Sequence, residues 1–278
     1  MSTRDHDAGP DTVTYRRYLE ETDPLREQTN LDIVAALELP IGSRGLDIGC
    51  GIGTQALMLA RAVGPRGHVT GLDIRPEFLQ VARDSAARMG LSDRVSLTEG
   101  DCGDLPFEDG AFDWVWSSDF LGYTLLPREV TRVIKPGGSL IIVFWSSEQL
   151  LPGYPRLELR LKATSAGLAP FHTGSRPESH PLRGLARHRE LGLTDTRAMT
   201  FVTSVHAPMS PAMFQAMADI LEMRWSNVES ELSKEDFELY RRLTDPGSPE
   251  YILNLPDYYG FFTYSVFTSR VPRDADRA

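Results

Sequence analysis

The chain has 278 residues, a formal net charge of −10 and a pI near 5.1. The length suits one large domain or two small ones, and with 41% hydrophobic and 24% charged residues the composition is that of a folded globular protein rather than a disordered one. The acidic balance argues against a nucleic-acid backbone as the main partner, and no run of Lys and Arg offsets it.

The compartment is indicated by what the sequence lacks. Two cysteines, Cys50 and Cys102, are too few for a disulfide framework. The first residues, MSTRDHDAGPDT, are polar and lack the apolar core of a signal peptide. No stretch approaches the roughly 18 apolar residues that a membrane helix needs. We therefore expect a cytoplasmic protein with no membrane segment.

The N-terminal residues 1–22 are predicted to form a flexible segment, because they open on a polar run that contains Gly9 and Pro10. A single domain is then expected over residues 23–278. It begins with a helix, because Asp23-Pro24 is a typical helix start and an apolar helical face follows as far as Pro40.

Gly45 to Leu57, reading GLDIGCGIGTQAL, is the most informative stretch. A short apolar strand ends in Leu46, Asp47 and Ile48, a turn contains Gly49, Gly51 and Gly53, and a helical segment follows. Such a turn lets a ligand approach the backbone closely, and the first N–H groups of the helix point towards it unpaired. The spacing G-x-G-x-G differs from the G-x-G-x-x-G of dinucleotide sites. An acid at the strand end suits an ammonium group better than a pyrophosphate.

Strands and helices alternate along the first half of the chain. Further strands are predicted at residues 68–74, 95–97, 112–117 and 140–145, and helices at 55–63, 76–90 and 126–135. This alternation predicts an α/β fold with a doubly wound, mostly parallel sheet.

Polar residues fall where these strands end, at Asp47, Asp73, Asp101 and Ser117. In doubly wound sheets, ligands bind beyond the carboxyl ends of the strands, at the point where the strand order reverses. A carboxylate placed like Asp73 can accept both hydroxyls of a ribose, although NAD enzymes also place an acid there. These four residues are therefore expected to line one site.

Four ordered motifs resemble those of the class I S-adenosylmethionine-dependent methyltransferases. They are the glycine turn, Asp101-Cys102 after Glu99-Gly100, the segment DLPFEDGAFDWVWSS from Asp104, and EVTRVIKPGGSLIIVF from Glu129. The resemblance covers about Asp32 to Trp145. It implies a seven-stranded Rossmann-like methyltransferase fold with helical insertions, and S-adenosyl-L-methionine as the cofactor.

The resemblance also implies roles for individual residues. Asp47 and the turn Gly49–Gly53 would hold the methionine moiety, Asp73 the ribose, and Asp101 with Cys102 the adenine. The predicted cofactor-binding residues are Asp47, Gly49, Cys50, Gly51, Gly53, Thr54, Asp73, Ile74, Asp101, Cys102 and Ser117.

The second half is less regular. Two insertions, about residues 146–180 and 207–257, interrupt the family pattern and are predicted to form a substrate lid, since long insertions in compact domains tend to be functional. Extra packing on the sheet is the alternative. Ser210 and Ser233 are predicted helix caps, and the Met-rich helix between Met213 and Met223 is expected in the core.

The sequence names no catalytic residue. Asp119 and Tyr123 follow the fourth strand closely enough to reach a transferred methyl group, and a surface role suits either equally well. No group of side chains has metal-ligand spacing, so no metal is expected. We predict methyl transfer to a small organic molecule. The alternatives are a non-catalytic cofactor-binding or regulatory protein of the same fold and an NAD-dependent oxidoreductase. The acceptor and the oligomeric state stay open.

Overall fold

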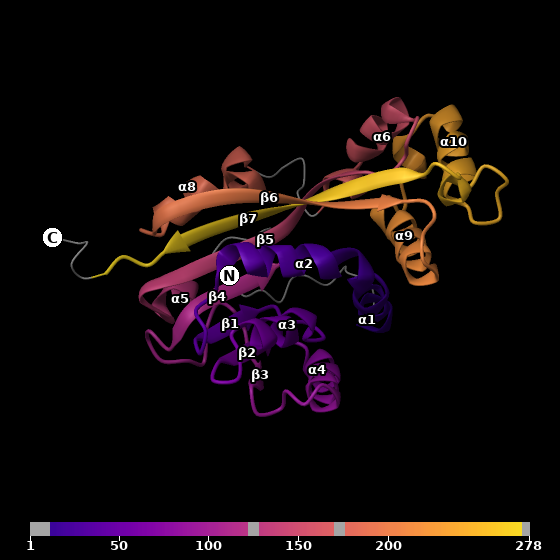
Figure 1. Cartoon of the computed structure of the whole chain (residues 1–278). Coiled ribbons are helices and arrows are strands. Elements are labelled where there is room, and N and C mark those ends of the chain that lie inside the picture. The colour runs from indigo at the N-terminus through magenta and orange to yellow at the C-terminus, as the bar shows by residue number, and fades with distance from the viewer. Residues whose placement is uncertain (1–11, 122–127, 170–175, 274–278) are drawn as a thin grey trace.

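A computed structural model describes residues 12–121, 128–169 and 176–273 (Figure 1). Their seven strands form one sheet in the order β3-β2-β1-β4-β5-β7-β6. The strands are β1 (Arg44–Ile48), β2 (His68–Asp73), β3 (Val95–Glu99), β4 (Phe112–Ser118), β5 (Ile134–Gln149), β6 (Thr194–His206) and β7 (Tyr259–Arg270). The first five pair in parallel, whereas β7 runs antiparallel to both β5 and β6. The predicted mostly parallel, seven-stranded sheet is confirmed.

Helices cover both faces of this sheet. The helices of the described residues, some of which lie beyond one end of the sheet, are α1 (Thr12–Glu21), α2 (Asp23–Leu37), α3 (Thr54–Ala62), α4 (Pro76–Arg88), α5 (Arg128–Arg132), α6 (Pro155–Lys162), α7 (Ser165–Leu168), α8 (Gly184–Glu190), α9 (Pro211–Arg224) and α10 (Lys234–Thr244). Short 3₁₀ turns are η2 (Pro177–Ser179), η3 (Pro181–Arg183), η4 (Glu229–Glu231) and η5 (Ile252–Asn254).

The two faces have separate cores. Ile33 of α2 and Leu59 of α3 pack with Trp114 and Tyr264 on one face. On the other, Val130 of α5 packs with strand residues such as Ile142 and Phe267, and α8 joins through Leu185. Alternate residues of each strand therefore point to opposite cores, as expected of a sheet covered on both faces.

The chain crosses the sheet between β3 and β4, so β1 lies between β2 and β4. Asp47 of β1 pairs with Gly71 of β2 on one side and with Trp116 of β4 on the other. Because parallel strands end at the same edge, the residues that follow β1, β2 and β4 meet there. The strand order thus places the glycine turn at the switch point of the fold.

Strand β5 differs from its prediction. It runs through Ser146 to Gln149, which the sequence assigned to the first insertion. After a register shift between Trp145 and Ser147, these residues continue to pair with β7. A β-bulge explains the error, because it breaks the alternation that the sequence pattern depends on. The helix predicted at 126–135 is also shorter, since only α5 is helical among its described residues.

The N-terminal segment also differs from its prediction. Residues 1–11 lie outside the described part of the chain, but Thr12–Glu21 forms helix α1. Arg16 bonds Glu20 at 2.9 Å and Arg17 lies 3.6 Å from Glu21, both at a spacing of four residues. Such pairs stabilise a helix only slightly, and contacts of α1 with α2 and α9 hold it in place.

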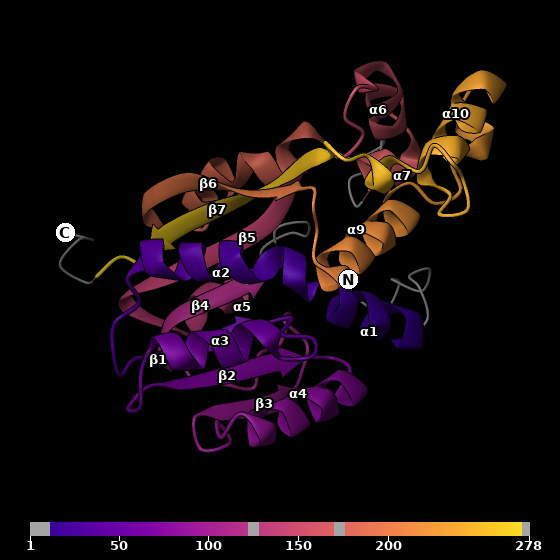
Figure 2. The same cartoon turned by 45° about the vertical axis from the view of Figure 1, so that its right-hand side comes forward.

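The long strands β5, β6 and β7 carry a group of helices beyond one end of the sheet, formed by α6, α7, α9 and α10 (Figure 2). We call these four helices the helical lobe. Its predicted caps are confirmed, because Ser210 accepts from the Met213 N–H and Ser233 from the Asp236 N–H, each at 3.2 Å. Met217 is buried in the core, as expected. No helix in the described ranges has the length and apolar character to cross a membrane.

Candidate functional site

The glycine turn leaves β1 with its backbone in the left-handed region. The φ angles of Gly49, Gly51 and Gly53 are +75°, +52° and +85°, which disfavour any residue with a Cβ. The N–H groups of Gly49 and Cys50 both donate to the carbonyl of Leu72, at 2.8 and 3.0 Å. These bonds tie the turn to β2, and α3 starts directly after it.

Asp47 is the most unusual residue of the site. Its side chain is 1% exposed, and its Oδ2 atom has no hydrogen-bond partner. Burial, followed by the nearby charge of Asp73, raises the pKa of the carboxyl to about 8, against a smaller opposing effect of the Ala56 N–H. An unpaired buried acid of this kind is costly and is typical of a site that receives a cation.

Asp73 ends β2 and holds the turn from the other side. Its Oδ2 accepts from the Gly51 N–H and its Oδ1 from the Arg75 N–H, both at 2.9 Å. A carboxylate has about four acceptor positions. Both oxygens can therefore accept further bonds from a ligand with two adjacent hydroxyls.

Ile74 follows β2, and Asp101 and Cys102 follow β3, so these residues lie on the side of the site next to those strands. Ile74 is 57% exposed, which is unusual for a large apolar residue directly after a strand. Asp101 accepts a bond from the Gly103 N–H at 2.8 Å, which fixes a tight turn. Burial first, and then Asp101, raises the pKa of the Cys102 thiol to about 11, so this thiol stays protonated at neutral pH.

The remaining predicted residues have structural roles that their chemistry explains. Ser117 is fully buried, donates to the Ile48 carbonyl at 2.9 Å and accepts from the Leu121 N–H at 3.2 Å. It links β1 to the segment after β4. The buried Cys50 thiol packs where a side chain at Gly71 would stand. Thr54 is the first residue of α3 and is half-buried.

Helix α1 covers the turn, which the sequence did not predict. A Cβ on Gly51 would stand 3.5 Å from a methyl group of Leu19. The ring of Tyr15 lies 5.9 Å from that of Phe78 on α4, and the Arg75 guanidinium stands 5.3 Å from the Tyr15 ring. The sequence signal that could have predicted this helix was two Arg–Glu pairs spaced four residues apart, and this signal is weak.

A second group lies where β4 and β5 end. Asp119 has a φ of +50° directly after β4, and its carboxylate accepts from Arg26 of α2 at 3.1 Å and from the Trp145 N–H at 2.7 Å. The next residue, Phe120, packs over Gly49 so closely that a Cβ there would lie 2.7 Å from its ring. Asp119 therefore precedes a residue that packs on the glycine turn, and its part in a reaction stays a prediction. Tyr123 is outside the described residues.

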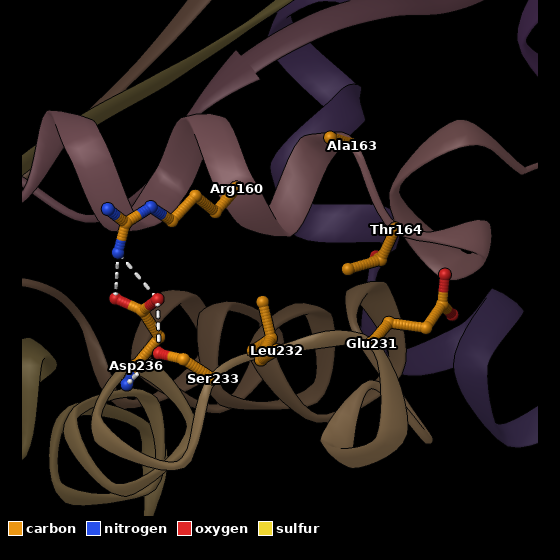
Figure 3. A pocket seen from close by; sticks show the side chains of 7 residues that line it. All are labelled: Arg160, Ala163, Thr164, Glu231, Leu232, Ser233 and Asp236. Atoms are coloured by element: carbon orange, nitrogen blue, oxygen red, sulfur yellow. Dashed lines mark hydrogen bonds and ion pairs between the residues drawn. The ribbon is translucent and has the colours of Figure 1, made fainter.

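A cavity of about 220 Å³ lies elsewhere, between α6 and α10 in the helical lobe (Figure 3). On its wall Arg160 forms an ion pair with Asp236 at 2.5 Å. None of the predicted cofactor-binding residues lines this cavity. Within the ranges described, no group of His, Cys, Asp or Glu could hold a metal ion, and the expected absence of a metal stays a prediction.

Comparison with known proteins agrees with this geometry. Residues 46–138 match the model of a methyltransferase domain. Over 120 residues the chain is 37% identical to the demethylmenaquinone methyltransferase of Staphylococcus aureus (strain JH9), an alignment that covers 42% of this chain and 48% of that protein. The chain thus spans about half the length of the curated relatives it matches.

Two solved structures share the fold. An S-adenosylmethionine-dependent methyltransferase from Aquifex aeolicus superposes with a TM-score of 0.51 at 15% identity, over 92% of this chain and 97% of that one. Phosphoethanolamine N-methyltransferase 2 of Haemonchus contortus, solved with S-adenosyl-L-methionine, superposes with a TM-score of 0.55 at 17% identity. The match covers 95% of this chain and 59% of that one. At these identities the likeness concerns the fold alone.

Proposed function

We propose that the protein transfers a methyl group from S-adenosyl-L-methionine to a small organic acceptor, since residues 46–138 match the model of a methyltransferase domain. The observation that carries the proposal is the buried Asp47 carboxylate with its unpartnered oxygen at the glycine turn. An α-ammonium group would give that oxygen a charge-assisted partner and lower the pKa of the acid.

Four other predicted residues, Asp73, Ile74, Asp101 and Cys102, fit the rest of this cofactor. When bound, it supplies an electrophilic methyl group on a sulfonium. Asp73 would accept the two ribose hydroxyls while it keeps its bonds to the turn. The exposed side chain of Ile74 would pack against the adenine, and Asp101 with the Cys102 N–H would face its edge.

The residues of the chain would contribute mainly positioning. Direct displacement needs the nucleophile and the methyl carbon in line, and holding them so supplies much of the rate. The glycine turn and Asp73 would fix the cofactor, and Phe120 on Gly49 would limit where the methyl group can point. A cover that excludes water completes such a site.

Helix α1 and the helical lobe would form that cover and the acceptor pocket. In support, β5 leads directly from the carboxyl edge of the sheet into α6, and α1 contacts both the glycine turn and α9. This extends the predicted lid, made of residues 146–180 and 207–257, by an element that precedes the sheet. A cytoplasmic location stays part of the proposal on the low cysteine content, and the lack of a nucleic-acid partner on the net charge of −10.

A thermal-shift comparison tests the proposal against NAD binding. S-adenosylmethionine is expected to raise the melting temperature, as any ligand of the native state does, and NAD is expected to leave it unchanged. Asp84→Asn, at an exposed position of α4, is the matched control for Asp47→Asn. A shift with NAD alone would contradict the proposal.

A turnover assay separates the enzyme from a non-catalytic binding protein. S-adenosylhomocysteine release is measured with a panel of small phenols, enols, amines and thiols. Release above the acceptor-free rate with any of them supports the enzyme. Binding without release across the panel favours the non-catalytic alternative.

A further inference from the structure

A polar cluster beside the glycine turn indicates which methyl acceptors the site binds. Arg26 of α2, Asp119 after β4 and Tyr264 of β7 come from three elements that the fold brings together. The Arg26 guanidinium and the Asp119 carboxylate form an ion pair at 3.1 Å, with side chains 18% and 22% exposed. We call these three residues the acceptor cluster.

Tyr264 carries a buried hydroxyl that the fold itself does not use. The residue is 1% exposed, and its oxygen has no hydrogen-bond partner. Burial raises the pKa of this phenol. The charge of Arg26 lowers it by a smaller amount, and the charge of Asp119 raises it. Buried polar atoms are nearly always bonded, so this hydroxyl is available to bind a ligand.

Arg26 is a donor with capacity to spare. Burial acts to lower its pKa, but Tyr264, Asp119 and Tyr15 outweigh this effect and raise it, so the guanidinium is charged. A guanidinium has five N–H donors, and the bond to Asp119 uses one of them. Arg26 can therefore donate further hydrogen bonds to a ligand.

The cluster lies next to the proposed position of the methyl group. Asp119 is followed by Phe120, whose ring covers Gly49. Tyr15 of α1 lies between the acceptor cluster and Asp73. Burial raises the pKa of its phenol, and the charges of Arg26 and Asp119 on one side and of Arg75 and Asp73 on the other also act on it. An acceptor bound by the cluster would thus meet the cofactor.

We propose that Arg26 and Tyr264 bind the ionised oxygen of a weakly acidic hydroxyl, so that the acceptor is a phenol or an enol; this rests on the proposed function. Charge-assisted donors stabilise an oxyanion and lower the pKa of the bound hydroxyl. Asp119 balances Arg26, so the empty cluster has no net charge, which suits a ligand that arrives neutral. The hydroxyl proton leaves to the solvent as the oxyanion binds, and the electron pair stays on the acceptor oxygen.

The test is a spectroscopic titration of the full chain saturated with S-adenosylhomocysteine. Three phenols of increasing size serve as probes, 4-nitrophenol, 7-hydroxycoumarin and 1-naphthol, because the absorbance or fluorescence of each differs between the neutral and ionised forms. At least one is expected to bind as the anion. Its pKa in the complex should be lower than in water by about one unit or more, which corresponds to a tenfold preference for the ionised form.

The variants assign the effect to the cluster. Tyr264→Phe and Arg26→Gln are each expected to weaken binding of that phenol by roughly tenfold or more, the effect of one charge-assisted bond. Tyr259→Phe is the matched control, since Tyr259 lies on the same strand but is 51% exposed. Calorimetry with S-adenosylhomocysteine shows whether each variant is folded. If Arg26→Gln fails this check, Tyr264→Phe carries the test, because it removes a single oxygen.

The outcomes separate the two proposals. If S-adenosylhomocysteine does not bind the wild-type protein, the proposed function is wrong and the acceptor assignment is wrong with it. If it binds, but no phenol binds as the anion, or both variants bind the phenol like the wild type, the acceptor assignment alone is overturned.

Discussion

The carboxylate of Asp73 accepts a hydrogen bond of 2.9 Å from the backbone N–H of Gly51, 22 positions earlier in the chain. The same side chain that is proposed to hold the ribose therefore also shapes the turn proposed to hold the methionine moiety. Loss of the carboxylate should affect both halves of the cofactor site at once.

For Asp73→Asn we expect a loss of S-adenosylmethionine affinity of about tenfold or more, since a charged acceptor bond is worth roughly 1.5–3 kcal/mol. An amide has only one acceptor oxygen, so either the Gly51 or the Arg75 N–H loses its partner. Calorimetry measures the affinity, with Asp84→Asn as the control. Equal affinity in Asp73→Asn and wild type would rule out this role.

Asp47→Asn should stabilise the protein without ligand. An acid whose pKa is raised to about 8 in the folded state makes folding less favourable as pH rises from its unfolded value near 4 up to about 8, because the folded state holds a proton that the unfolded state has lost. The amide has no such dependence. Its melting temperature should therefore exceed that of the wild type increasingly over this pH range.

At pH 8 the difference should reach roughly 10 °C or more, because the folded pKa lies about four units above the unfolded one, each unit is worth about 1.4 kcal/mol, and each kcal/mol shifts the melting temperature by about 2–4 °C at this size. Thermal melts at several pH values measure it. A variant that is less stable than wild type at pH 8 would show that the carboxylate is satisfied in the fold.

Gly51→Ala and Gly90→Ala form a matched pair. Both glycines have positive φ, +52° and +65°, and a Cβ on Gly90 meets nothing within 4 Å. Backbone strain should cost each variant roughly 1 kcal/mol of stability. Gly51→Ala alone should lose cofactor affinity, because its methyl group enters the space between the turn and α1. If the two variants bind S-adenosylmethionine equally well, the cofactor lies away from Gly51.

Helix α1 should become more protected when the cofactor binds. Hydrogen exchange with S-adenosylhomocysteine is expected to slow in Thr12–Glu21, which covers Gly51, and to stay unchanged in α8 on the opposite face. With an acceptor also present, residues 146–180 or 207–257 should gain protection. Protection of the turn alone, with α1 and both insertions unaffected, would show that these elements are not a lid.

The sequence predicted the parallel half of the fold because each element there follows its local pattern. Asp47 and Asp73 could be placed at strand ends by their position after apolar runs. The extension of β5 into Ser147–Gln149 could not be predicted, because a bulge after Trp145 shifts the register. Beyond the bulge the strand continues through its pairing with β7.

The acceptor half of the site was harder to predict for a different reason. Asp119 could be proposed from its place after β4, but Arg26 and Tyr264 lie 93 and 145 positions away from it, and only the strand order brings them together. Helix α1 has no buried residue of its own, so no apolar stripe reveals its packing. Tertiary contacts determine these features, and local patterns do not carry them.

Proton release on cofactor binding tests the central claim, that Asp47 receives the cationic group of S-adenosylmethionine. Since the pKa of the free acid is about 8, binding near pH 7 should release close to one proton. Calorimetry in two buffers of different ionisation enthalpy measures this number. The account predicts a buffer-dependent enthalpy for the wild type and none for Asp47→Asn. Binding without proton release in the wild type, or equal release and affinity in Asp47→Asn, would contradict it.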